Sequence, residues 1–374
     1  MQHGDLVDTA RALRRRSVVR RPALDAQMLL LAGCFLSFIL ICLPGCSSPS
    51  DKLPVYAGDP EPGDPAYQTK LQIKYLGAGG VVIKRGDDVL LTAPFFSNPS
   101  IPRVAFGKIR SLPEQINRFL DKKRDTYLAA ANAILVGHAH YDHLMDVPYI
   151  KREYMPQARV YGSKTMKNIL SGARDLQAGD IVSVEEKQVG TFKEPGKWWY
   201  PSPRLRFMAL ESEHAPILFG LKLFEGTYSE PLPELPTRAS GWREGQTLAY
   251  LIDFLGADGK TVEFRVHYQD AASTAPLGFP PLDKLDDQRP IDLAIVCMPG
   301  FDQVKHYPDA FIKTFTPQFV VIVHWENFFE PLPDVASKLR TVPTENAERF
   351  LAILNEMNVK FKLPAPGAWM HFPP

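Results

Sequence analysis

The chain reads His138-Ala139-His140-Tyr141-Asp142-His143 directly after an apolar run at residues 133–136 and a single glycine at 137. The apolar run predicts a buried strand, and the motif follows as a turn at the end of that strand. Because alternate side chains of an extended segment point to the same side, His138 and His140 can bind one metal ion together. The chain must then turn, so we expect Asp142 and His143 to point toward a second ion.

This set of ligands predicts a site for two divalent cations. Imidazole and carboxylate groups suit zinc first, with manganese or iron as alternatives. The whole chain of 374 residues contains nine histidines, so three of them within one short turn form a strong concentration. We therefore interpret the motif as a metal site rather than as a polar surface loop.

The composition narrows the possible partners. The chain has 43 basic and 42 acidic residues, and 45% of its residues are hydrophobic. It is long enough for one large domain or two small ones with a sizeable core. Nucleic acid binding requires a marked surplus of basic residues, so we expect no nucleic acid partner.

Residues 1–45 predict a signal segment. Arginines are concentrated between residues 11 and 21, and an apolar run follows from residue 28 to 43. This order is typical of secretory signals, and the run is shorter than the ~20 residues that span a bilayer. The pair Gly45-Cys46 resembles the end of a bacterial lipoprotein signal. We expect an exported protein that is anchored to the membrane on the periplasmic side through Cys46; the alternative is an uncleaved anchor with a structural Cys46.

The rest of the chain divides into a tether and one domain. Residues 46–68 are rich in Ser, Pro, Gly and Asp, which predicts a flexible tether. The folded domain is expected at residues 69–374. Cys297 is its single cysteine, inside an apolar run, so no disulfide is expected there.

Alternating and apolar runs predict a sequence of strands and helices. Strands are expected at residues 71–75, 81–83, 89–91, 134–136, 159–161, 181–184, 205–210, 247–254, 262–266, 293–297 and 319–323. Helices are expected at residues 113–123, 144–149, 163–170, 310–315 and 344–357. The strand at 71–75 alternates in polarity and is expected to have one solvent-exposed face. Mixed sheets with helices outside them predict a layered α/β sandwich.

The six-residue motif resembles the His-x-His-x-Asp-His signature of the metallo-β-lactamase superfamily, and the resemblance extends from about residue 70 to the end of the chain. It implies a four-layer αββα sandwich with two metal ions at one edge. It also implies further ligands after later strands, in a fixed order. His214 follows the apolar run 205–210, Asp270 ends the segment 262–270, and His324 follows the run 319–323.

The resemblance divides these residues between two ions that share one aspartate. The expected ligands are His138, His140 and His214 for the first ion and Asp142, His143, His324 and the shared Asp270 for the second.

One position departs from the superfamily pattern. An Asp-Pro pair usually follows the third strand, where the acid braces the ligand loop, but this chain has Ala93-Pro94. Loss of a partner behind the ligands weakens metal binding or activity. Thr92 could supply a hydroxyl in its place.

The expected chemistry is hydrolysis. Two divalent ions outweigh the charge of Asp142, Asp270 and a bridging hydroxide, so the site attracts an anionic or polarised group. The metals lower the pKa of bound water, and the resulting hydroxide would attack phosphorus or a carbonyl carbon. Asp142 therefore counts among the catalytic residues, and His306 is a candidate general acid for the leaving group.

The leading interpretation is a membrane-tethered, metal-dependent hydrolase of a phosphodiester or related anionic ester. The closing His-Trp pair is similar to the branch that includes N-acyl-phosphatidylethanolamine phospholipase D and ascorbate-lactonase-like proteins. A small-molecule or lipid-like ester is the expected substrate, and residues 197–200 and 227–246 are candidate rims of the pocket. A lactonase or another carboxylic-ester or amide hydrolase is the alternative. A non-catalytic metal-binding lipoprotein is a third possibility, which Ala93 and the Gln269-Asp270-Ala271 context favour.

Overall fold

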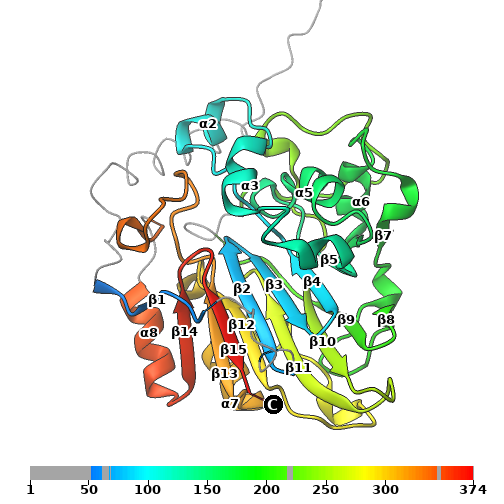
Figure 1. Cartoon of the computed structure of the whole chain (residues 1–374), viewed down its shortest axis with the longest axis vertical. Helices are drawn as coiled ribbons and strands as arrows, with labels where there is room; N and C mark the ends of the chain where they lie inside the picture. Colours follow the sequence, from blue (N-terminus) through cyan, green and yellow to red (C-terminus); the bar gives the residue numbers. More distant parts are fainter. Residues whose placement is uncertain (1–51, 61–66, 68, 217–221, 343–346, 374) are drawn as a thin grey trace, which may run out of the picture. The chain divides into compact units, whose positions relative to one another are not determined.

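The computed structural model describes residues 52–60, 67, 69–216, 222–342 and 347–373. The predicted signal segment at residues 1–45 and the predicted lipid-anchor residue Cys46 lie outside this part of the chain. Within it, no helix has the length and apolar character needed to span a membrane. Two mixed sheets face each other, with helices beside both of them (Figure 1). This architecture confirms the predicted α/β sandwich.

The first sheet is antiparallel on one side and parallel on the other. Its strand order is β15-β2-β3-β4-β5-β6-β7. Strands β15, β2, β3 and β4 pair antiparallel, whereas β4 to β7 pair parallel. The bounds are β2 Leu71–Gly77, β3 Gly80–Arg85, β4 Asp88–Thr92, β5 Ala133–Leu135, β6 Arg159–Gly162, β7 Ile181–Ser183 and β15 Trp369–Phe372.

The second sheet repeats this division. Its order is β1-β14-β13-β12-β11-β10-β9-β8, with antiparallel pairs from β8 to β11 and parallel pairs from β11 to β1. The bounds are β1 Val55–Tyr56, β8 Trp198–Ser202, β9 Leu205–Glu211, β10 Leu248–Leu255, β11 Val262–Gln269, β12 Leu293–Cys297, β13 Phe319–Val323 and β14 Lys360–Pro364.

Short helices connect the strands. The α-helices are α2 Ile101–Phe106, α3 Pro113–Phe119, α4 Tyr141–Leu144, α5 Val147–Glu153, α6 Lys164–Leu170, α7 Asp309–Phe315 and α8 Ala347–Glu356. Helices α3, α5 and α6 lie beside the first sheet, and α8 lies beside β14 of the second (Figure 1). The imidazole of His267 in β11 packs on Phe311 of α7 with a ring distance of 4.2 Å, so α7 covers the outer face of the second sheet.

The inner faces of the two sheets form the core. Tyr250 of β10 donates a hydrogen bond to the carbonyl of Val136 at 2.8 Å, and Tyr268 of β11 donates to that of Gly79 at 2.7 Å. All residues of β2 are buried, so the expected exposed face of this strand is wrong. The ammonium of Lys74 on that face is paired with the buried carboxylate of Asp125 at 2.7 Å, which is why a polar residue can lie there.

Part of the segment predicted to be a tether belongs to the second sheet. Val55–Tyr56 form β1, which pairs parallel with β14. Asp59 contacts the first sheet as well, through a bridge to Trp369 of β15 and a hydrogen bond that its carboxylate accepts from the amide of His371 at 2.8 Å. The edge of β14 offers unpaired backbone groups, and residues 55–56 pair with them. The composition of this segment alone indicates no regular structure.

Strand direction explains why distant residues meet at one edge. Strands β9 and β11 both pair antiparallel with β10, so they run in the same direction, and β12 and β13 run parallel to β11. The segments that follow β9, β11 and β13 therefore emerge at the same edge of the second sheet. They carry His214, Asp270 and His324.

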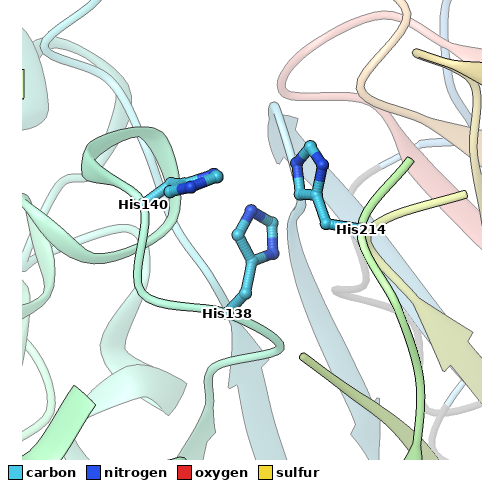
Figure 2. A group of neighbouring side chains, drawn as sticks. All are labelled: His138, His140 and His214. Carbon is cyan, nitrogen blue, oxygen red and sulfur yellow. The ribbon is translucent and has the colours of Figure 1, made fainter. Parts of the chain in front are cut away.

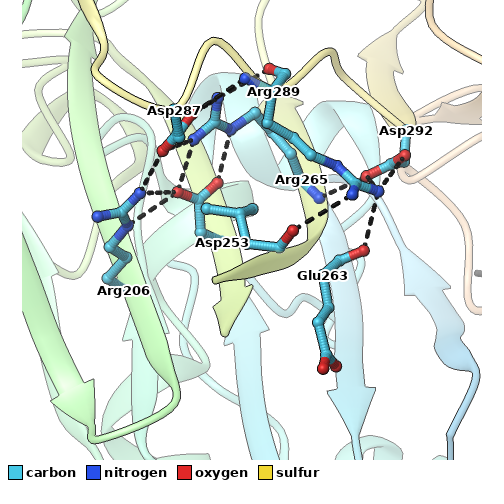
Figure 3. Close-up of polar contacts among 8 residues, drawn as sticks. Arg206, Asp253, Glu263, Arg265, Asp287, Arg289 and Asp292 are labelled. Atoms are coloured by element: carbon cyan, nitrogen blue, oxygen red, sulfur yellow. Dashed lines mark hydrogen bonds and ion pairs between the residues drawn. The ribbon is translucent and has the colours of Figure 1, made fainter. Parts of the chain in front are cut away.

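A buried ionic network lies across the same strands, away from that edge (Figure 3). Arg206 of β9, Asp253 of β10 and Arg265 of β11 are paired in register, and both arginines contact the Asp253 carboxylate at 2.7–2.8 Å. Asp253 and Arg265 are fully buried. Asp287 and Asp292 extend the network, and Asp292 accepts from the amide of Arg265 at 2.8 Å. The loop between β11 and β12 is held to the sheet in this way.

Candidate metal centre

The motif spans the end of the turn after β5 and the first three residues of helix α4. His140 precedes the first helical residue, and the amide of Ala139 donates to the carbonyl of Glu244 at 2.9 Å. Gly137 has no room for a side chain, because a Cβ there would collide with the carboxylate of Asp270. The backbone of the motif therefore approaches the expected shared ligand directly.

The first group of candidate ligands is formed by three histidines. The rings of His138 and His140 are 4.7 Å apart, and they lie 4.7 Å and 5.0 Å from that of His214. Figure 2 shows the three imidazoles turned toward a common point. Nδ1 of His214 is within hydrogen-bond distance of the carbonyl of Ala215 at 2.7 Å, which orients the ring and leaves Nε2 for a ligand.

The second group joins the end of the motif to β13. Nε2 of His324 lies 3.3 Å from Oδ2 of Asp142 and 3.2 Å from Nε2 of His143. All three residues are buried. These atoms lie within 4.8 Å of one another, as the donors of one cation must.

Asp270 connects the two groups. Its carboxylate lies 3.2 Å from Nδ1 of His138 and 3.1 Å from Nδ1 of His143. The structure thus brings together every residue that the sequence analysis named as a ligand. Their binding of metal remains a prediction.

The role of His306 as a general acid stays a prediction. It is exposed, in the turn before α7, with a φ of 58°. It belongs to none of the three donor groups found among the described residues. The two aromatic residues that follow it, Tyr307 and Phe311, are buried.

The protonation states of the ligands suit a cation. Burial lowers the pKa of His138 to about 3, and it also lowers the pKa of His140 and of His214. These imidazoles are neutral at pH 7, which is the form that binds metal. Burial opposes the protonation of His143, but the nearby Asp270 and Asp142 raise its pKa above the usual value. The carboxylates therefore favour a positive charge at this point.

Several buried nitrogen atoms of the site have no partner within the described part of the chain. They include Nε2 of His138 and Nε2 of His140. A buried polar group without a partner is costly, so a ligand at this point would satisfy both. The donor set of imidazoles and carboxylates, the neutral histidines and the close approach at Gly137 all fit a pair of divalent cations.

A turn between β2 and β3 of the first sheet also supports the site. The carbonyl of Gly79 accepts hydrogen bonds from Thr92 and Tyr268, both at 2.7 Å. The Tyr268 hydroxyl also lies 3.2 Å from Oδ2 of Asp270. A Cβ at Gly79 would lie 2.8 Å from Nδ1 of His143, so this position requires glycine. Thr92 thus supplies a hydroxyl where Ala93, fully buried, offers none.

Tyr75, Glu326 and Tyr268 are supporting residues that the sequence analysis did not identify. Glu326 is buried two residues after His324, and it accepts from the amide of Ala78 at 2.6 Å. In the sequence, Glu326 is recognisable only as an acidic residue that follows the apolar run 319–323 and the pair His324-Trp325. The two tyrosines lie in strands whose alternation predicts only that they are buried.

Half-buried aromatic rings flank both groups. The ring of Phe224 lies 6.1 Å from that of His140, and the ring of Phe328 lies 4.6 Å from that of His324. The two predicted rims differ. The aromatic residues of the cluster at 197–200 lie in edge strand β8. There the ring of Trp199 packs on that of Tyr161. The segment 227–246 does reach the motif, through the carbonyl of Glu244.

Comparison of the sequence with protein families and with curated proteins finds no match. Comparison of the fold finds solved structures that are similar at low identity. One is a metallo hydrolase from the archaeon Ignicoccus hospitalis, 15% identical, with a TM-score of 0.47 over 82% of this chain and 99% of that chain. Another is a metallo-β-lactamase fold protein from Bacillus subtilis, 12% identical, with a TM-score of 0.44 over 81% of this chain and 100% of that chain.

A third similar structure is CmlA, a diiron β-hydroxylase from Streptomyces venezuelae, 14% identical, with a TM-score of 0.43 over 83% of this chain and 55% of that chain. These proteins differ in the chemistry that their names state. Similarity at this level assigns no activity to this chain.

Proposed function

We propose that the protein is a hydrolase that depends on two divalent cations. The observation that supports this most directly is the pair of donor groups joined by Asp270, one made of His138, His140 and His214 and the other of Asp142, His143 and His324. Zinc is the first choice for such donors, and manganese and iron are the alternatives. A pair of cations, when bound, polarises a substrate oxygen and lowers the pKa of water.

The chain's own residues prepare the site for this chemistry. Asp142 and Asp270 are held ionised, since the nearby histidines lower their pKa although burial opposes this. His138 and His140 stay neutral, as their lowered pKa values require. Two carboxylates leave a net positive site when two divalent cations are present, so an anionic ester is favoured over a neutral one. A phosphodiester is the substrate class that we infer.

The aromatic rings support a substrate with an apolar part. Phe224 stands beside the first donor group and Phe328 beside the second, and both are partly exposed. Partly exposed aromatic side chains beside polar ligands are typical of small-molecule sites. A lipid-like or aromatic phosphodiester would place its apolar group against them.

The test is turnover by the purified protein after chelation and return of metal. Zinc, manganese or iron is added back, and hydrolysis of bis(p-nitrophenyl) phosphate is compared with that of a simple lactone. We expect phosphodiester turnover that His140→Ala abolishes and that the control His371→Ala, at a histidine outside the donor groups, retains. Turnover of the lactone alone would identify a carboxylic-ester hydrolase, and metal retention without any turnover would identify a binding protein.

We also propose that the chain is exported and anchored through a lipid on Cys46. The support is the order of an arginine-rich segment, an apolar run and the Gly45-Cys46 pair. Palmitate labelling and fractionation of cells that express the full chain test this. The wild type should be labelled and sediment with membranes, and Cys46→Ala should lose the label. An unlabelled wild type contradicts the proposal.

A further inference from the structure

The backbone of His324 adopts an uncommon conformation. Its φ is 61°, in the left-handed region that residues with a Cβ seldom adopt. His324 directly follows β13, whose regular extension would carry the next side chain along the alternation of the strand. The left-handed turn instead places Nε2 of His324 3.3 Å from Asp142 and 3.2 Å from His143. The geometry of the second donor group therefore depends on whatever holds this turn.

A chain of hydrogen bonds holds it. The amide of His324 donates to the hydroxyl of Tyr75 at 2.9 Å, and that hydroxyl donates to Glu326. The other carboxylate oxygen of Glu326 accepts from the amide of Ala78 at 2.6 Å. Ala78 is also left-handed, with a φ of 46°. Tyr75 and Glu326 are almost fully buried, at 0% and 1% exposure, so no water competes for these bonds.

The same carboxylate thus joins two turns from different sheets. One turn is the β2–β3 connection, which contacts His143 through Gly79, and the other carries His324. Ala93, at the position where a bracing acid was expected, has only a methyl group to offer. Glu326 is a buried acid that contacts a ligand-bearing turn from another place in the sequence.

We propose that Glu326 and Tyr75 are positioning residues for the second cation, the one held by Asp142, His143 and His324. The inference rests on the proposed function, because it requires that the site binds two cations. Among the hydrogen bonds of the described residues, those of Tyr75 and Glu326 do not involve His138, His140 or His214. Removing either one should therefore weaken the second cation and leave the first in place.

Calorimetric titration of the metal-free full chain with Zn²⁺ tests the selectivity. We expect two equivalents in the wild type. In Tyr75→Phe the hydroxyl between His324 and Glu326 is gone, and in Glu326→Gln one acceptor becomes a donor. Loss of such a partner lowers metal affinity by about 10- to 100-fold, and we expect this for the second equivalent alone. Tyr75→Phe keeps the aromatic volume in the core, so it carries the test if Glu326→Gln does not fold.

Asp292→Asn is the matched control. Asp292 is also a buried carboxylate that accepts from a backbone amide, that of Arg265 at 2.8 Å, but it lies in the network away from the donor groups. The Asp292→Asn variant should have a lower melting temperature and unchanged affinities for both zinc ions. Unchanged affinity for both cations in Tyr75→Phe and Glu326→Gln overturns the inference and leaves the proposed function standing. A wild type that takes up fewer than two equivalents overturns the two-cation proposal and the inference with it.

Discussion

At the scale of single residues, the site depends on positions where a side chain is excluded. Gly137 separates β5 from the motif, and a Cβ at this position would overlap the Asp270 carboxylate. Gly137→Ala should displace Asp270 from between His138 and His143 and lower metal affinity by about 10- to 100-fold. Metal content after dialysis, measured by mass spectrometry, checks this. Gly179→Ala is the control, since nothing lies within 4 Å of its Cβ; full metal content in Gly137→Ala would contradict the account.

The ligand residues themselves could be predicted because their chemistry is concentrated in few residue types. His138, His140 and His143 share one short turn, whereas His214, Asp270 and His324 were implied by the resemblance, each at the end of an apolar run. The supporting residues could not be predicted in this way. Tyr75 supports the site through a hydroxyl at one position of an alternating strand, and nothing in that alternation shows which ligand it faces. His306 was named from its loop, and its role stays a prediction.

At the scale of elements, the strands with regular alternation or continuous apolar runs were predictable, and the edges were not. β1 comes from a segment rich in Pro and Gly, and it becomes a strand only because β14 has an open edge. β8 was interpreted as a loop rim, although its aromatic residues have high strand propensity and pack on β9. β14 and β15 were not predicted, since neighbouring turns and prolines shorten their patterns.

From the pairing of β9, β10 and β11 we also predict an effect on stability. Asp253 is fully buried between Arg206 and Arg265, so Asp253→Ala leaves the charge of Arg265 in the core without this partner. Breaking a buried ion pair from one side costs about 3–5 kcal/mol. Urea unfolding of the two proteins measures the difference. Asp283→Ala, at an exposed pair with Lys284, should change stability by no more than about 0.5 kcal/mol. Equal stabilities for Asp253→Ala and the wild type would show that the network contributes nothing.

At the scale of the whole molecule, the two sheets are joined by the site as well as by the core. The first sheet supplies the motif after β5 and the β2–β3 turn, whereas the second supplies His214, Asp270 and His324. A cation held by residues of both sheets stabilises the folded chain by mass action. Stability and metal binding should therefore change together with pH.

The metal-free protein should lose stability as the pH falls. The pKa of His138 is lowered to about 3 and that of His267 to about 4, and those of His140 and His214 are lowered as well, so the unfolded chain takes up these protons first. The contribution of these four histidines to the stability of the fold is full above about pH 6.5 and declines below it. The raised pKa of His143 acts in the opposite sense, but it is one group against four.

Melting temperatures between pH 8 and pH 5 measure this loss, with and without Zn²⁺. The melting temperature of the metal-free chain should decline below about pH 6.5, where the unfolded chain begins to bind protons. Zinc should raise the melting temperature at pH 8 and raise it less toward pH 5, because the pKa of His143 is raised and its proton then competes with the metal. A zinc effect that is the same at both pH values would place the bound ion away from His143.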